Sequence, residues 1–93
     1  MKLTDFAEKY SIAVETGTFI GDTAKHLATY FKEVHTIELD KGLYLQSLRG
    51  LQGVSNVSSY LGDSSFILSS ELIDKLNHKD EKVFFFRCTL EWG

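Results

Sequence analysis

The feature that most constrains the fold is a regular alternation of short apolar runs with segments of helical periodicity. The apolar runs are rich in β-branched and aromatic residues and stop at glycine or polar residues, as buried strands do. These runs are residues 11–15, 34–39, 57–61 and 83–86. Between them, apolar residues recur three and four positions apart, which places them on one face of a helix. Because strands separated by helices pair in parallel, the alternation predicts an α/β fold.

The order of the segments predicts how the strands are arranged. Four strands with intervening helices form half of a doubly wound parallel sheet, with the expected strand order 3-2-1-4 and helices on both faces. A short helix after Thr4 comes first, and Asp40 and either Ser64 or Ser65 are expected to cap later helices. The fourth strand has the sequence of a fully buried strand, but in this chain we expect it to be a sheet edge that a complete fold of this type would cover. The expected core-facing helix residues are Ala24, Leu27, Ala28, Phe31, Leu43, Tyr44, Leu48, Leu68, Leu72, Ile73 and Leu76.

Length and charge exclude several classes of protein. The chain has 93 residues, 43% of them hydrophobic, and a net charge of −3, so we expect one ordinary globular domain. The few basic residues are dispersed and form no stripe that could neutralise phosphates, so we expect no nucleic-acid partner. No apolar run is long enough for a membrane span, and no Cys/His cluster has metal-ligand spacing. We expect no signal peptide and a cytoplasmic protein.

Three strands of the predicted sheet are followed by polar segments at residues 15–21, 38–40 and 62–64, and the first and third of these contain glycine. Parallel sheets bind ligands beyond the carboxyl ends of their strands, so these segments mark a candidate crevice. Gly17 permits a tight turn and close approach of a ligand, and Gly21 permits close packing where the next helix begins. The loop is neither G-x-G-x-x-G nor a P-loop. Because Asp22 would repel a pyrophosphate, we expect a ligand with an amine as well as a carboxylate.

Two acidic residues at neighbouring strand ends could bind a nucleoside through hydrogen bonds. Glu38 lies 21 residues after Gly17, where a carboxylate can accept hydrogen bonds from both ribose hydroxyls. Asp63 ends the third strand, where it could bind an exocyclic amine. Each feature also has a plain structural interpretation: a solvated strand end for Glu38, and a turn with a helix cap for residues 62–64. The histidines are expected to be surface or packing residues, and no nucleophilic role is assigned to Cys88.

Taken together, these segments resemble a known family. Residues 14–23 (VETGTFIGDT), 35–40 (HTIELD) and 60–65 (YLGDSS) look like the first three motifs of class I S-adenosylmethionine-dependent methyltransferases. The similarity covers residues 12–86. It implies a Rossmann-like fold that binds S-adenosyl-L-methionine. It implies that Glu15, Gly17 and Thr18 line the methionine end of the cofactor, with Gly21 in the same loop. It further implies that Glu38 holds the ribose, and that Asp63 and Ser64 flank the adenine.

The sequence departs from the family in two places. Phe19 stands where the fuller motif often has a third glycine. The family's catalytic domain has about seven strands, and this chain supplies four. Its substrate-determining elements and general base are therefore expected outside this chain. We interpret residues 1–86 as a truncated cofactor-binding domain, with little or no catalytic activity of its own.

The last seven residues are unlike the rest of the chain, since they hold its only Cys, its only Trp and one of its two Arg residues. Residues 86–93 can be encoded by TTT CGA TGC ACA CTG GAG TGG GGG. Read one base later, the same string encodes Phe-Asp-Ala-His-Trp-Ser-Gly, and Phe-Phe-Asp-Ala-His-Trp often follows strand four in methyltransferases with a similar opening. Our hypothesis is that residues 87–93 are an out-of-frame tail; a natural short tail is the alternative. The nucleotide sequence from the Val83 codon onward would decide between them.

Two other classes of function stay open. A Rossmann NAD(P)-binding protein would use Glu38 equally well, although the missing G-x-G-x-x-G and the position of Asp22 argue against it. A non-catalytic α/β module could act by association through its fourth strand. The methyl acceptor and the oligomeric state are not predicted by the sequence.

Overall fold

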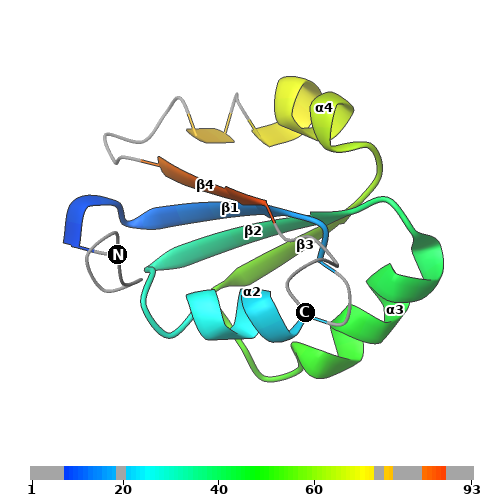
Figure 1. The fold of residues 1–93 in the computed structure, drawn as a ribbon, viewed down its shortest axis with the longest axis horizontal. Coiled ribbons are helices and arrows are strands. Elements are labelled where there is room, and N and C mark those ends of the chain that lie inside the picture. The colour runs from blue at the N-terminus through cyan, green and yellow to red at the C-terminus, as the bar shows by residue number, and fades with distance from the viewer. Residues whose placement is uncertain (1–7, 19–20, 73–74, 77–82, 88–93) are drawn as a thin grey trace.

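The computed structural model describes residues 8–18, 21–72, 75–76 and 83–87. Its centre is a four-stranded sheet with the order β3-β2-β1-β4 (Figure 1). The strands are β1 (Ile12–Thr16), β2 (Glu33–Glu38), β3 (Val57–Leu61) and β4 (Val83–Arg87). All neighbours are parallel, with Thr16 opposite both Ile37 and Arg87. The predicted strand order and parallel pairing are therefore confirmed.

Helices cover both faces of the sheet. In Figure 1, α2 (Asp22–Leu27) and α3 (Lys41–Gly50) lie below the sheet and α4 (Ser64–Ile67) lies above it. A π-helical turn, η1 (Leu68–Leu72), directly continues α4. Both Ser69 and Ser70 donate their hydroxyls to the Phe66 carbonyl, at 3.1 and 2.6 Å. Side-chain competition for a backbone acceptor is one cause of irregular helix geometry.

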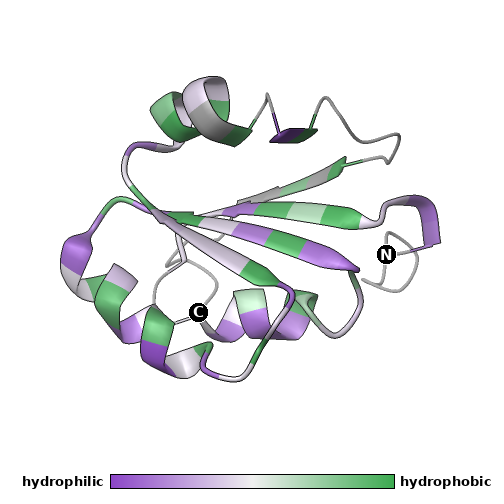
Figure 2. Ribbon diagram, turned by 180° about the vertical axis from the view of Figure 1, so that it is seen from behind, coloured by the Kyte–Doolittle hydropathy of each residue, from purple (hydrophilic) through white to green (hydrophobic). Residues whose placement is uncertain are grey.

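Each face has its own hydrophobic core, because side chains of a strand point alternately to the two sides. Ala13 of β1 belongs to the core on the side of α2, whereas the adjacent Val14 belongs to the core on the side of α4 and η1. The first core comprises Ala13, Ala24, Leu27, Phe31, Val34 and Leu51, and the second Val14, Ile37, Ile67 and Leu72. The ribbon of Figure 2 accordingly carries both hydrophobic and hydrophilic positions along the helices, as expected of elements with one buried side.

Several sequence predictions need correction. β1 and β2 are each shifted by one residue from the predicted runs, so that Leu39 follows β2 and is 72% exposed. On α3 the buried residue is Ser47, and Leu48 is 40% exposed. β4 is a sheet edge, as the predicted strand order implies, but the further expectation of a fully buried strand is wrong, because Phe85 is 59% exposed. Most of the helix predicted after Thr4 lies outside the described residues, as do Ile73 and the tail after Arg87.

Candidate functional site

A cavity of about 130 Å³ opens at the carboxyl ends of β1, β2 and β3. Two backbone hydrogen bonds shape its floor. Gly17 N–H donates to the Ile37 carbonyl at 2.8 Å, and Gly62 N–H donates to the Glu38 carbonyl at 2.9 Å. The loops that follow β1 and β3 are therefore each hydrogen-bonded to β2. Gly17 has a φ of 82°, a conformation that glycine adopts without strain. The residues lining the cavity are Thr16, Gly17, Ile37, Glu38, Leu39, Gly62, Asp63 and Ser64.

The structure therefore brings together four of the predicted site residues: Gly17, Glu38, Asp63 and Ser64. Glu38 is the last residue of β2 and only 6% exposed. Its Oε2 accepts a hydrogen bond from the Asp40 N–H at 2.9 Å, which fixes the carboxylate at the rim of the cavity. Asp40 in turn caps α3 by accepting from the Leu43 N–H at 2.8 Å, as the sequence predicts. The same short turn thus positions the acidic side chain and starts the helix.

Asp63 has a structural role that the sequence placed on its neighbours. Its Oδ1 accepts from the Ser65 N–H at 2.9 Å and the Phe66 N–H at 3.2 Å, so Asp63 caps α4. The prediction that Ser64 or Ser65 is the cap is wrong, because Asp63 has both the extended conformation and the side-chain hydrogen bonds of the cap residue. Asp63 and Ser64 nevertheless line the cavity.

Glu15 and Thr18 lie beneath the cavity rather than along it. Glu15 is fully buried, and Thr36 on β2 donates its hydroxyl to Glu15 Oε1 at 2.6 Å. The Thr36 oxygen is also 2.6 Å from Thr18 Oγ1, so Thr18, itself 2% exposed, must donate to Thr36. This Glu15–Thr36–Thr18 chain joins β1, β2 and the loop after β1. Burial raises the pKa of Glu15 to about 7; the Thr36 hydrogen bond acts in the opposite direction, and nearby Glu38 raises the pKa further.

Gly21 packs against α3 and does not line the cavity. It is the N-cap residue of α2, with φ 93°, and a Cβ at this position would lie 3.2 Å from Leu51 Cγ and 3.3 Å from the Ser47 carbonyl oxygen. The predicted close packing at Gly21 is therefore present. The role of Gly21, Glu15 and Thr18 toward a ligand stays a prediction.

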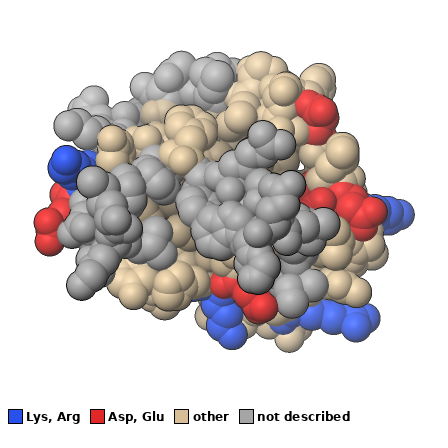
Figure 3. All heavy atoms as spheres, viewed as in Figure 1, with Lys and Arg blue, Asp and Glu red and all other residues tan. Residues whose placement is uncertain are grey.

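The cavity has an acidic lining. Its two ionisable residues, Glu38 and Asp63, are both carboxylates, and its described lining contains neither Lys nor Arg. In Figure 3, acidic side chains are visible at several places, among them the right of the view, where the strands end in Figure 1 and where basic side chains also lie. Such a site favours hydroxyls and cations over phosphates.

The lining also includes Ile37, which lies outside the segments predicted to form the crevice, and Leu39, which lies within one of them but was not named as a site residue. Leu39 follows Glu38, and its apolar side chain is largely exposed at the cavity. An apolar residue exposed beside a carboxylate at a strand end could have been noticed, but the period-2 pattern of residues 34–39 made it look like the last residue of the strand. Thr36 was likewise counted only as a strand residue.

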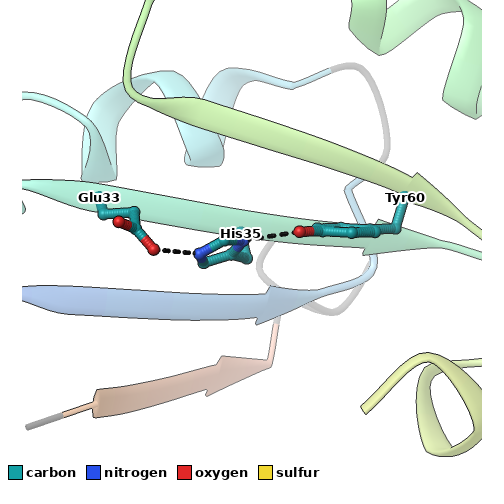
Figure 4. A network of polar contacts seen from close by, with 3 residues as sticks. All are labelled: Glu33, His35 and Tyr60. Atoms are coloured by element: carbon teal, nitrogen blue, oxygen red, sulfur yellow. Dashed lines mark hydrogen bonds and ion pairs between the residues drawn. The ribbon is translucent and has the colours of Figure 1, made fainter. Parts of the chain in front are cut away.

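A second polar network lies on the face of the sheet that α4 covers. His35 is 5% exposed and contacts Glu33 through Nε2 and the Tyr60 hydroxyl through Nδ1, the latter at 2.9 Å (Figure 4). Because a carboxylate only accepts, Nε2 donates to Glu33, and in the neutral imidazole Nδ1 then accepts from the Tyr60 hydroxyl. None of the three residues lines the cavity, so this network is assigned to the packing of β2 against β3. The described residues contain no group of three potential metal ligands and no helix that could cross a membrane.

No protein-family model and no curated protein matches the sequence. Among solved structures, the fold is similar to that of TomG, an O-methyltransferase from Streptomyces achromogenes involved in tomaymycin synthesis, whose crystal structure is in complex with SAM. The TM-score is 0.69 and the sequence identity 21%, over 94% of this chain and 41% of TomG. The chain therefore has a methyltransferase-like fold and spans less than half the length of this neighbour.

Proposed function

We propose that this chain is the S-adenosylmethionine-binding part of a class I methyltransferase. The observation that carries the proposal is the acidic cavity at the strand ends, where Gly17, Glu38, Asp63 and Ser64 meet. The SAM-bound structural neighbour supports the proposal at the level of the fold. Bound S-adenosylmethionine would supply an electrophilic methyl group on a sulfonium.

The described residues fit part of such a cofactor. A cavity of about 130 Å³ is smaller than the roughly 300 Å³ of the smallest typical ligand pockets, so it would enclose a ribose-sized portion. Glu38 would accept hydrogen bonds from the ribose hydroxyls. Leu39 would offer an apolar surface to the base, with Asp63 and Ser64 on the other side of the cavity. Gly17 leaves room for close approach of the ligand to the backbone.

A dinucleotide is the less favoured ligand. NAD(P) brings a pyrophosphate, and the described cavity lining offers two carboxylates and no cation to meet it. S-adenosylmethionine has no phosphate and carries positive charge on its sulfonium and amine. The charge of the lining therefore favours the methyl donor.

Calorimetric titration of the chain with S-adenosylmethionine, S-adenosylhomocysteine and NADH tests the proposal. We expect both adenosyl ligands to bind and NADH not to. In Glu38→Gln the amide oxygen can still accept from the Asp40 N–H, so the turn is kept while the charged hydrogen bonds to the ribose are lost. Such bonds contribute about 1.5–3 kcal/mol, which predicts about 10- to 150-fold weaker binding.

The matched control is Glu8→Gln, which changes the charge equally at an exposed residue outside the cavity lining. It should bind like the unaltered chain. Binding of NADH alone would replace the proposal with the dinucleotide alternative. A well-behaved dimer without affinity for any of the three ligands would favour an interaction module.

The proposal includes the extent of the domain. Residues 1–86 would be the cofactor-binding front part of a longer enzyme and residues 87–93 an out-of-frame tail, with the acceptor site and the general base supplied elsewhere. We therefore expect ligand binding without methyl transfer from the 93-residue chain. Measured turnover by the purified chain would contradict this part of the proposal.

A further inference from the structure

The carboxyl group of Glu15 is an unusual feature of the region beneath the cavity. The side chain is fully buried. Its Oε1 accepts from Thr36, but its Oε2 is buried without a hydrogen-bond partner among the described residues. A buried carboxylate with one oxygen unpaired is costly, whereas the neutral acid avoids most of that cost. The geometry therefore favours a protonated Glu15 while no positive charge is nearby.

The surroundings of Glu15 explain why its charge would respond to the cavity. Of the elements packed against it, α2 presents Ala24 and Leu27 to the core and α3 presents Ser47, none of them charged. The residue opposite on β4 is Phe86. Among the residues that the structure describes, the charged group that acts on Glu15 is Glu38, whose negative charge raises the pKa of Glu15.

Glu15 is connected to the cavity by three routes. Thr16 and Gly17 follow it directly in the chain and line the cavity. Glu38 both lines the cavity and acts electrostatically on Glu15. Thr18, at the end of the Glu15–Thr36–Thr18 chain, directly follows Gly17, which lines the cavity. A positive charge placed at the cavity would therefore stabilise the ionised form of Glu15.

We propose that Glu15 is a proton-linked element of this site: it releases its proton to solvent when a cationic ligand binds, so that the site discriminates a sulfonium from the corresponding neutral thioether. The inference rests on the proposed function, because it takes the adenosyl sulfonium as the ligand. The proton stoichiometry of binding is as follows: Glu15 is protonated before the ligand binds and ionised in the complex, and one proton passes to the buffer.

Proton release is measured by titrating the chain with S-adenosylmethionine in buffers of different ionisation enthalpy. A group with a pKa of about 7 is about half protonated at pH 7, so about half a proton should be released there and almost none at pH 9. The affinity for S-adenosylmethionine should increase about tenfold between pH 6 and pH 8 through this linkage. S-adenosylhomocysteine, which lacks the sulfonium charge, should release less than about half as much.

Glu15→Gln separates this effect from the titration of the ligand itself, whose α-amino group changes charge near pH 8. The variant keeps the shape of the side chain and cannot ionise, so the difference between the two proteins is the contribution of Glu15. Equal proton release by both proteins would overturn the inference while leaving the proposed function standing. Failure of both adenosyl ligands to bind the unaltered chain would instead remove the proposed function.

Thr36→Val is the second variant, in case Glu15→Gln does not fold. Because the Thr36 hydrogen bond lowers the pKa of Glu15, its removal should shift the window of proton release to higher pH. The carboxyl carbon resonance of Glu15 reports the same ionisation directly by NMR, with and without S-adenosylmethionine. A Glu15 resonance that titrates identically in both states would contradict the inference.

Discussion

Gly21 and Gly53 have nearly the same backbone conformation but different surroundings. Their φ angles are +93° and +83°, and a Cβ at Gly21 would meet Leu51 and Ser47, whereas nothing lies within 4 Å of one at Gly53. Gly53→Ala should therefore lose only the conformational term, roughly 1–2 kcal/mol. Gly21→Ala adds overpacking, which typically costs about 1–3 kcal/mol more. Midpoints of urea unfolding, compared at equal m-value, measure both losses.

Equal losses for the two variants would show that Gly21 is required only for its backbone angle. A larger loss at Gly21 would show that this glycine sets the distance between the loop after β1 and α3. The same contact explains why the buried residue of α3 is Ser47 rather than a leucine. A small side chain is needed where Gly21 approaches the helix, and hydrophobic periodicity alone cannot reveal that requirement.

At the scale of the elements, β4 is the strand whose surroundings matter most. It pairs with β1 on one side only, and Phe85 is exposed on it. Exposed apolar edge strands are sites of self-association. Phe85→Lys should therefore reduce self-association, measured by light scattering over a range of chain concentrations. Phe66→Lys is the matched control, since Phe66 is 65% exposed on α4 and not on a strand edge. Equal effects of the two substitutions would point to general surface hydrophobicity instead.

The elements differ in how far the sequence could predict them. The strands could be predicted because each apolar run ends at glycine or at polar residues. These ends mark the carboxyl edge of the sheet and with it the positions of Gly17, Glu38 and Asp63. The cap of α4 was misassigned because Asp63, Ser64 and Ser65 are all good capping residues. The hydrogen bond from Gly62 to β2 selects Asp63, and that contact is not local in the sequence.

At the scale of the whole molecule, the sheet and the helices on one of its faces together form the environment of Glu15. The sequence placed Glu15 at the end of the first strand, but its burial depends on how β2, α2 and α3 pack around it. Strand alternation puts Thr36 on the same face, opposite Glu15 in the register. The neutral carboxyl under the cavity is therefore a property of the assembled sheet, which no single motif could predict.

This environment predicts how the stability of the unliganded chain depends on pH. The pKa of Glu15 rises from 4.5 to about 7 on folding, so between these values the native state binds a proton that the unfolded state has released. With respect to this group, stability should therefore be greatest and constant below about pH 4.5, fall as the pH rises to 7, and level off above it. The shift corresponds to about 3 kcal/mol. Glu15→Gln should remove this slope and be more stable than the unaltered chain at pH 8. Urea unfolding at pH 5, 6, 7 and 8 measures the effect, and parallel pH profiles for the two proteins would mean that Glu15 is ionised in the native state throughout this range.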